Sequence, residues 1–245
     1  MTKNMLEVAG LCKNYGNFAA VKNLNFSVKK GEVLGFLGPN GAGKTTTMKI
    51  ITGFIPMSAG EVFVDGKNIL EHSVETRSII GYLPETTPLY TDMNVSEYLT
   101  FIGKLRGLSG ENLKRQTAKM IEVCGLEAMH RKTVGHLSKG YRQRTGIAQA
   151  MIHEPDLLIL DEPISGLDPK QIVEIRKLIK EIGKEKAVVY CSHILPEIAA
   201  TCDRIIIINN GETAAAGTVD ELTKNGTVPL EDIFVELTAN SREGE

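Results

Sequence analysis

The stretch Gly38-Pro39-Asn40-Gly41-Ala42-Gly43-Lys44-Thr45-Thr46, here called the phosphate loop, decides how this sequence folds. It matches G-x-x-x-x-G-K-[ST] in full and follows the apolar run Val33–Leu37. Residues 44–52 after it read as a helix that Gly53 ends. Glycines allow successive N–H groups to converge on one anion, and a helix N-terminus adds positive potential. We therefore expect a nucleoside triphosphate here, with Lys44 at its β- and γ-phosphates and Thr45 on Mg²⁺.

A second signal is the acidic pair Asp161-Glu162 at the end of the apolar segment 157–160. Side chains at the carboxyl end of such a strand reach the crevice where open α/β sheets bind ligands. We expect Asp161 to hold Mg²⁺ through its water shell and Glu162 to orient and polarise the attacking water. Alone, the pair could also be a polar strand end before a turn at Pro163.

The remaining sequence predicts an α/β core interrupted by helices. Strands are expected at residues 24–29, 33–37, 61–64, 79–83, 157–160, 187–192 and 204–208. Asn94 with Glu97 forms the pattern of a capping box, and helical segments follow to about residue 154. Asp168-Pro169 opens another helix, because an Asp cap and a first-turn proline favour a helix start.

The segment Leu137-Ser138-Lys139-Gly140-Tyr141-Arg142-Gln143-Arg144, here called the signature segment, resembles the signature of ATP-binding cassette (ABC) ATPases. The family pattern L-S-G-G-Q is kept at Leu137, Ser138 and Gly140, whereas Lys139 and Tyr141 depart from it. The resemblance implies that Ser138, Lys139 and Gly140 face the γ-phosphate of ATP bound by another subunit. Outside this context Ser138 would be interpreted as a helix cap.

Three further positions follow the family's order along nearly the whole chain. Ser165-Gly166-Leu167-Asp168 resembles the D-loop, which contacts the opposite subunit, although Asp168 also suits a helix cap. His193 resembles the switch histidine that touches the γ-phosphate, and Tyr15 resembles the aromatic that stacks on adenine. A lone histidine is more often structural, and Tyr15 could be an ordinary core residue.

Glu85, in Gly81-Tyr82-Leu83-Pro84-Glu85, occupies a position where the family more often has Gln. The resemblance implies a contact with Mg²⁺ and with the transmembrane partner. A carboxylate is a better ligand for a hard cation than an amide oxygen, so we expect Glu85 to keep the metal role.

The resemblance implies a single ABC ATPase domain over residues 1–240, an α/β P-loop ATPase fold with a mixed sheet, an antiparallel β subdomain and an inserted helical subdomain. The core would comprise residues 1–93 and 155–240, the helical subdomain about 94–154, and residues 241–245 a frayed tail. Two copies would pair around ATP and Mg²⁺ and drive an integral membrane subunit from the cytoplasmic face of the membrane. The segment containing Leu89, Tyr90 and Met93 would receive that subunit, or would merely pack the insertion.

The export direction follows from a likeness to bacterial multidrug and gliding-motility exporters, carried by Leu83-Pro84-Glu85, Pro88-Leu89-Tyr90 and the signature segment. A soluble ABC ATPase is the alternative, but the stretch between Thr45 and Ser138 is too short for the long coiled coil of repair-type members. A regulator that does not hydrolyse ATP is disfavoured, because Glu162 and His193 are both present.

Composition limits the class of protein. The 245 residues are 42% hydrophobic and 24% charged with a formal net charge of -2, which is typical of a globular domain. Without a long Lys/Arg block, we expect no nucleic-acid partner. The apolar runs are of strand length, so we do not expect the chain to enter a membrane by itself.

Overall fold

Two sheets organise the part of the chain that the computed structural model describes, residues 3–239. The larger sheet has the order β10-β9-β3-β8-β7-β6, and its neighbours are parallel except for the antiparallel pair β10 and β9. Its strands are β3 (Val33–Leu37), β6 (Ile80–Leu83), β7 (Leu157–Asp161), β8 (Ala187–Ser192), β9 (Arg204–Asn209) and β10 (Glu212–Gly217). The antiparallel sheet contains β1 (Asn4–Tyr15), β2 (Phe18–Lys29), β4 (Ala59–Val64) and β5 (Lys67–Asn68).

Alternation along the central strands builds a core on each face of the larger sheet. On β7, Leu157 and Ile159 join the core shared with the antiparallel sheet and α1 (Lys44–Ile51), whereas Leu158 and Leu160 join the opposite core. All residues of β3, β7 and β8 are buried, as expected for parallel strands covered on both sides. Asp161 therefore continues the face that α1 covers.

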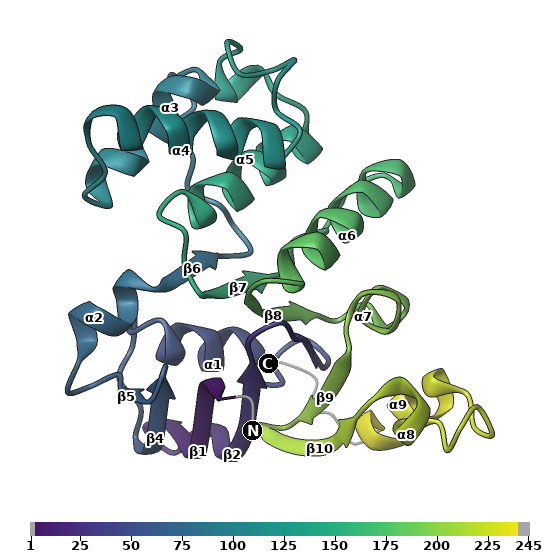
Figure 1. The fold of residues 1–245 in the computed structure, drawn as a ribbon. Coiled ribbons are helices and arrows are strands. Elements are labelled where there is room, and N and C mark those ends of the chain that lie inside the picture. The colour runs from purple at the N-terminus through teal and green to yellow at the C-terminus, as the bar shows by residue number, and fades with distance from the viewer. Residues whose placement is uncertain (1–2, 240–245) are drawn as a thin grey trace.

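Three helices between β6 and β7 form what we call the helical group: α3 (Val95–Leu105), α4 (Gly110–Val123) and α5 (Lys139–Met151). Figure 1 shows it at the end of the molecule opposite the antiparallel sheet. A 3₁₀ turn at Val134–His136 precedes α5. The remaining helices are α2 (Ser73–Ser78), α6 (Pro169–Gly183), α7 (Leu195–Thr201), α8 (Val219–Leu222) and α9 (Leu230–Thr238).

The predicted α/β fold with a mixed sheet, an antiparallel β part and inserted helices is confirmed. The capping box is present, since the Asn94 side chain accepts from the Glu97 N–H and the Glu97 side chain accepts from the Asn94 N–H. The subdomain limits near residues 94 and 154 stay a prediction, and the expected frayed tail, residues 241–245, lies outside the described residues. Within those residues no helix has both the length and the apolar character to cross a membrane.

Candidate functional site

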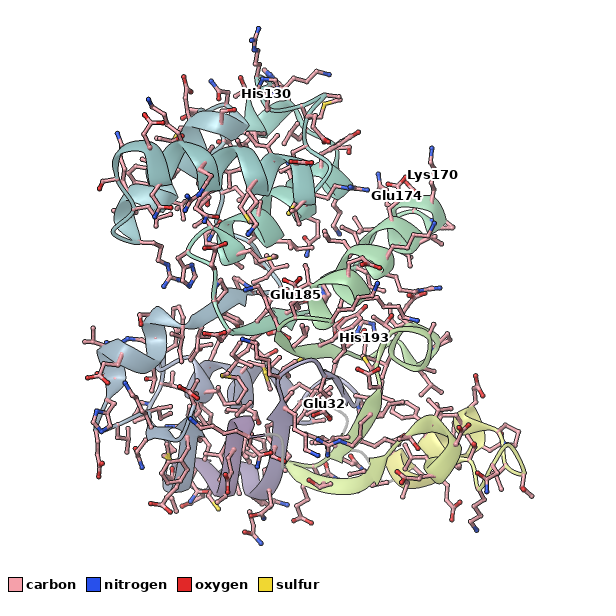
Figure 2. All side chains as sticks on the ribbon, viewed as in Figure 1. Glu32, His130, Lys170, Glu174, Glu185 and His193 are labelled. Carbon is pink, nitrogen blue, oxygen red and sulfur yellow. The ribbon has the colours of Figure 1, made fainter. Side chains whose placement is uncertain are left out.

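The site is built along one edge of the larger sheet. Because β3, β8, β7 and β6 are parallel neighbours, their carboxyl ends meet at the same edge. β3 leads into the phosphate loop, β8 into His193, β7 into Glu162 and β6 into Glu85. Figure 2 labels His193 where β8 passes toward α7. Segments far apart in the sequence are thereby gathered at one edge of the sheet, which is where open α/β sheets bind ligands in a crevice.

Lys44 is held inside the phosphate loop by two backbone carbonyl groups. Its ammonium donates to Gly38 O at 2.6 Å and to Pro39 O at 3.0 Å. Burial lowers the pKa of Lys44, and the nearby Glu162 and Asp161 carboxyl groups oppose this shift. The lysine is thus a buried cation held at the loop, where it can exchange its carbonyl partners for phosphate oxygens.

Two glycines of the loop are required by close backbone approaches. A Cβ on Gly43, which has φ +101°, would lie 2.6 Å from Ala20 O of β2. A Cβ on Gly38 would lie 2.4 Å from Ile208 O of β9. Each distance is shorter than any real Cβ contact, so only glycine fits at these two positions. The phosphate loop therefore packs closely against β2 and β9, and it directly follows β3 in the sequence.

Asp161 has the features expected of a ligand for a hard cation. It is fully buried, and neither carboxylate oxygen has a hydrogen-bond partner among the described residues. The Thr45 hydroxyl lies close by without reaching normal hydrogen-bond geometry. Burial raises the pKa of Asp161 to about 6, helped by Glu162 and Glu85 and opposed by Thr45 and Lys44. An unpartnered buried carboxyl is costly, and a cation would relieve that cost.

These residues fit Mg²⁺ as a companion of the substrate. In the described residues no three His, Cys, Asp or Glu side chains gather closely enough to hold a metal alone. Mg²⁺ is commonly bound by one or two protein oxygens together with waters and substrate phosphates. Asp161 and Thr45, which belongs to the phosphate loop, could supply those protein oxygens.

Glu162 is fixed by contacts from the neighbouring strand β8. It lies at φ 51°, which few non-glycine residues adopt, so the chain turns sharply after β7. Its Oε1 lies 2.8 Å from His193 Nδ1, and Ser192 Oγ donates to its Oε2 at 3.2 Å. The Glu162 carboxylate is buried whereas His193 is exposed, so the histidine connects the carboxylate to the open side of the crevice.

Tyr15 and Glu85 are two further predicted site residues, and both are exposed. Tyr15 is half-exposed at the end of the β1–β2 hairpin, with the Lys13 ammonium 5.0 Å from its ring centroid. Its interpretation as a core tyrosine is therefore wrong, and an exposed ring can stack on a base. Glu85 is exposed and close enough to Lys44 and Asp161 to influence the pKa of each.

The signature segment lies apart from this crevice, on the helical group. Ser138 caps α5 by accepting from the Tyr141 N–H at 3.4 Å, and both Ser138 and Lys139 are exposed. Asp168 caps α6 by accepting from the Gln171 N–H at 2.9 Å and is exposed as well. The structure therefore gathers the phosphate loop, Glu85, Asp161, Glu162 and His193. The D-loop begins beside this group, since the Ser165 N–H donates to Glu162 O at 3.2 Å, and its Gly166 lies against Lys139 of the signature segment.

Ser192 is a site residue that the sequence interpretation missed. Its hydroxyl supports Glu162 and also accepts from the Ile194 N–H at 3.1 Å. The available signal was its position as the last residue of an apolar strand, directly before His193. Tyr82 was also overlooked: burial and the nearby Asp161 raise the pKa of its phenol well above the usual range.

Comparison with known proteins agrees with this geometry. The family model described as ABC transporter matches residues 21–165. The linearmycin resistance ATP-binding protein LnrL of Bacillus subtilis is 38% identical over 219 residues, covering 89% of this chain and 70% of that protein. Among solved structures, an ATP-binding subunit of an ABC transporter matches with a TM-score of 0.84 and 31% identity over 95% of this chain and 99% of the other.

A further solved structure, a dimeric post-hydrolysis state of the ATP-binding cassette MJ0796 bound to ADP and Pi, matches with a TM-score of 0.78 and 25% identity. It covers 88% of this chain and 99% of that one. The crevice, the phosphate loop and these matches lead to one conclusion. The chain belongs to the ABC transporter family and is an ATP-hydrolysing ATP-binding protein.

Proposed function

We propose that two copies of this chain close around ATP and drive export through a separate integral membrane subunit. One observation carries the proposal. The chain contains two segments suited to bind an anion, the phosphate loop and the start of α5, but only the first lies at the same sheet edge as Glu162 and His193. An exposed helix N-terminus capped by Ser138 is suited to a phosphate that another chain presents. The dimeric MJ0796 cassette, a structural relative, supports this arrangement.

In the proposed reaction each residue acts on a stated atom. Lys44 and the loop N–H groups grip the β- and γ-phosphates, and Tyr15 stacks on adenine. Glu162 polarises the water that attacks the γ-phosphorus, while the bond to the ADP oxygen breaks. His193 holds Glu162 and contacts the γ-phosphate. Ser138, Lys139 and Gly140 complete the site from the second copy, and Asp168 contacts that copy, so an isolated monomer should hydrolyse ATP poorly.

The metal position would be completed by Thr45, Asp161 and Glu85. Mg²⁺ supplies charge neutralisation on the β- and γ-phosphates when bound. Glu85 adds a negative charge near Asp161, so ATP without metal should be repelled more strongly by this chain than by a variant with a neutral amide at that position. Glu85→Gln should therefore reduce the difference between the ATP affinity measured with Mg²⁺ and the ATP affinity measured with EDTA. An unchanged difference would remove Glu85 from the metal site.

The membrane subunit would dock beside the helical group. Leu89 and Met93 are partly buried against the core, so they serve packing as well. Tyr90 is 56% exposed and contacts Phe101 with ring centroids 5.5 Å apart. Phe54, at the end of α1, is 71% exposed. Exposed aromatic side chains are typical anchors of protein interfaces.

Export is inferred from likeness to LnrL, whose name describes linearmycin resistance. The direct test is isolation of the tagged chain from detergent-solubilised membranes of its host. We expect a polytopic membrane protein in stoichiometric amount, and higher ATPase activity in the complex than in the isolated chain. Tyr90→Ala should release that protein and leave ATP binding unchanged.

Val235→Ala is a matched control, since this valine is 65% exposed on α9, away from the docking surface. Isolation with a ribosome or a repair complex and no membrane protein would instead favour the soluble type of ABC ATPase. An ATPase rate unaffected by the membrane protein would contradict coupling to transport.

A further inference from the structure

The segments that would face a second subunit lie side by side across a seam between α5 and α6. Lys139, in the first turn of α5, reaches the D-loop: its Nζ would be 2.3 Å from a Cβ on Gly166. Gly140 meets α6, since a Cβ there would lie 2.5 Å from Gln171 Cδ. The seam therefore connects the signature segment of the helical group to the loop that Asp168 ends.

The two helices contact each other through side chains, such as Gln171 against Gly140 and Glu174 against Arg144. A cavity of about 490 Å³ lies beside the seam, and its lining combines apolar side chains such as Met120 with charged ones that include Arg144 and Glu174. Residues of both helices belong to one hydrophobic core, and the long side chains that bridge the seam help to set the distance between the helices.

Arg144 is the main bridge. Its Nη2 pairs with Glu174 Oε2 of α6 at 2.5 Å, and its Nη1 donates to Cys124 O at the end of α4 at 3.0 Å. The side chain of Arg144 is 17% exposed and that of Glu174 is 42% exposed, so the guanidinium is shielded from water whereas the carboxylate is partly open to it. A Cβ on Gly125 would lie 2.5 Å from Nη1, so glycine there leaves room for the guanidinium. Figure 2 shows Glu174 on the part of α6 beside the helical group.

We propose that Arg144 and Glu174 form a positioning pair that sets the spacing between Ser138 on α5 and Asp168 on α6. The planar guanidinium fixes two directions at once, toward α4 and toward α6, which a lysine ammonium cannot do. The signature segment and the D-loop then meet a second subunit as one preformed surface. This inference rests on the proposed function, because spacing matters only if a second copy docks there.

The test uses the full chain with Glu162→Gln to slow hydrolysis, and measures dimerisation in ATP and Mg²⁺ by sedimentation. Adding Glu174→Gln should raise the dimer dissociation constant up to about fivefold, as expected for the loss of an ion pair whose carboxylate is partly exposed to water. The affinity of the dilute monomer for ATP should stay within about twofold, because neither side chain lies at the phosphate loop. Glu181→Gln is the matched control, since Glu181 lies on the same helix but pairs with Lys184, the residue directly after that helix, at 2.7 Å.

A second readout does not need the dimer. Glu174→Gln should speed amide hydrogen exchange in the first turn of α5 about fivefold in the nucleotide-free chain, whereas Glu181→Gln should not. Glu174→Asp, which restores the carboxylate, should return both readouts toward the starting chain. Equal effects of Glu174→Gln and Glu181→Gln, or none, would overturn the positioning pair. If the Glu162→Gln chain stays monomeric, the proposed function fails, and the exchange result still decides the inference.

Discussion

Replacing His193 tests how the Glu162 carboxylate is held. Glu162 Oε1 lies 2.8 Å from His193 Nδ1, and Glu162 Oε2 accepts a hydrogen bond from the Ser192 hydroxyl at 3.2 Å. A hydrogen bond to a charged group contributes about 1.5–3 kcal/mol. His193 is 44% exposed, so water can replace part of that contribution, and the lower end applies. His193→Ala should therefore reduce kcat about tenfold, against about 10²–10⁴-fold for Glu162→Gln, which removes the base.

A double-substitution cycle separates the two roles. Phosphate release is measured at saturating ATP and Mg²⁺ for the starting chain, each single variant and the double variant. If His193 acts mainly through Glu162, His193→Ala should cost no more than about threefold in kcat once Glu162→Gln is present, and this remaining factor is what its contact with the γ-phosphate contributes. Independent effects that multiply in the double variant would refute the reasoning from this geometry. Ser192 remains in all four proteins and provides the common background.

Three other outcomes follow from single side chains. Burial lowers the pKa of His153 in the folded chain from 6.5 to about 4, and its Nε2 is hydrogen-bonded to a backbone carbonyl of β6. As the pH falls below 6.5, the unfolded chain therefore takes up a proton at this histidine before the folded chain does. The free energy of unfolding, measured by urea unfolding, should then fall by up to about 1.4 kcal/mol per pH unit between pH 6.5 and pH 4. In His153→Gln the free energy of unfolding should fall less steeply over the same range. Gly38→Ala places a Cβ 2.4 Å from Ile208 O and should destabilise the chain by about 1–3 kcal/mol in the same assay. Tyr15→Ala should weaken the binding of a fluorescent ATP analogue at least about fivefold, because the substitution removes a surface for stacking on the base. Phe18→Ala is the control, since Phe18 is exposed to a similar extent.

The parts of the site written in contiguous sequence could be predicted. The phosphate loop and the Asp161-Glu162 pair each combine an apolar strand with the residues that follow it, so strand position and chemistry are read together. The helix caps at Asn94 and Asp168 were predictable for the same reason, because a cap depends on residues three positions apart.

Contacts between distant segments could not be predicted. The Arg144–Glu174 pair joins residues 30 positions apart, and no local pattern marks their meeting. Strand β1 was missed because its register shifts against β2 break the alternation that reveals a strand. Strand β10 contains Ala214–Ala216 in a run with weak strand preference, and it forms because β9 supplies a pairing edge.

The most direct measurement of the central claim is the stoichiometry of the Glu162→Gln chain in ATP and Mg²⁺. Light scattering combined with nucleotide analysis should give particles of two chains and two ATP molecules, and the particles should return to single chains when EDTA is added. Glu162→Gln with Ser138→Arg, which blocks the start of α5, should remain a single chain with one ATP bound. A single-chain species of Glu162→Gln at saturating ATP, or dimers that form without nucleotide, would contradict an ATP molecule shared between two subunits.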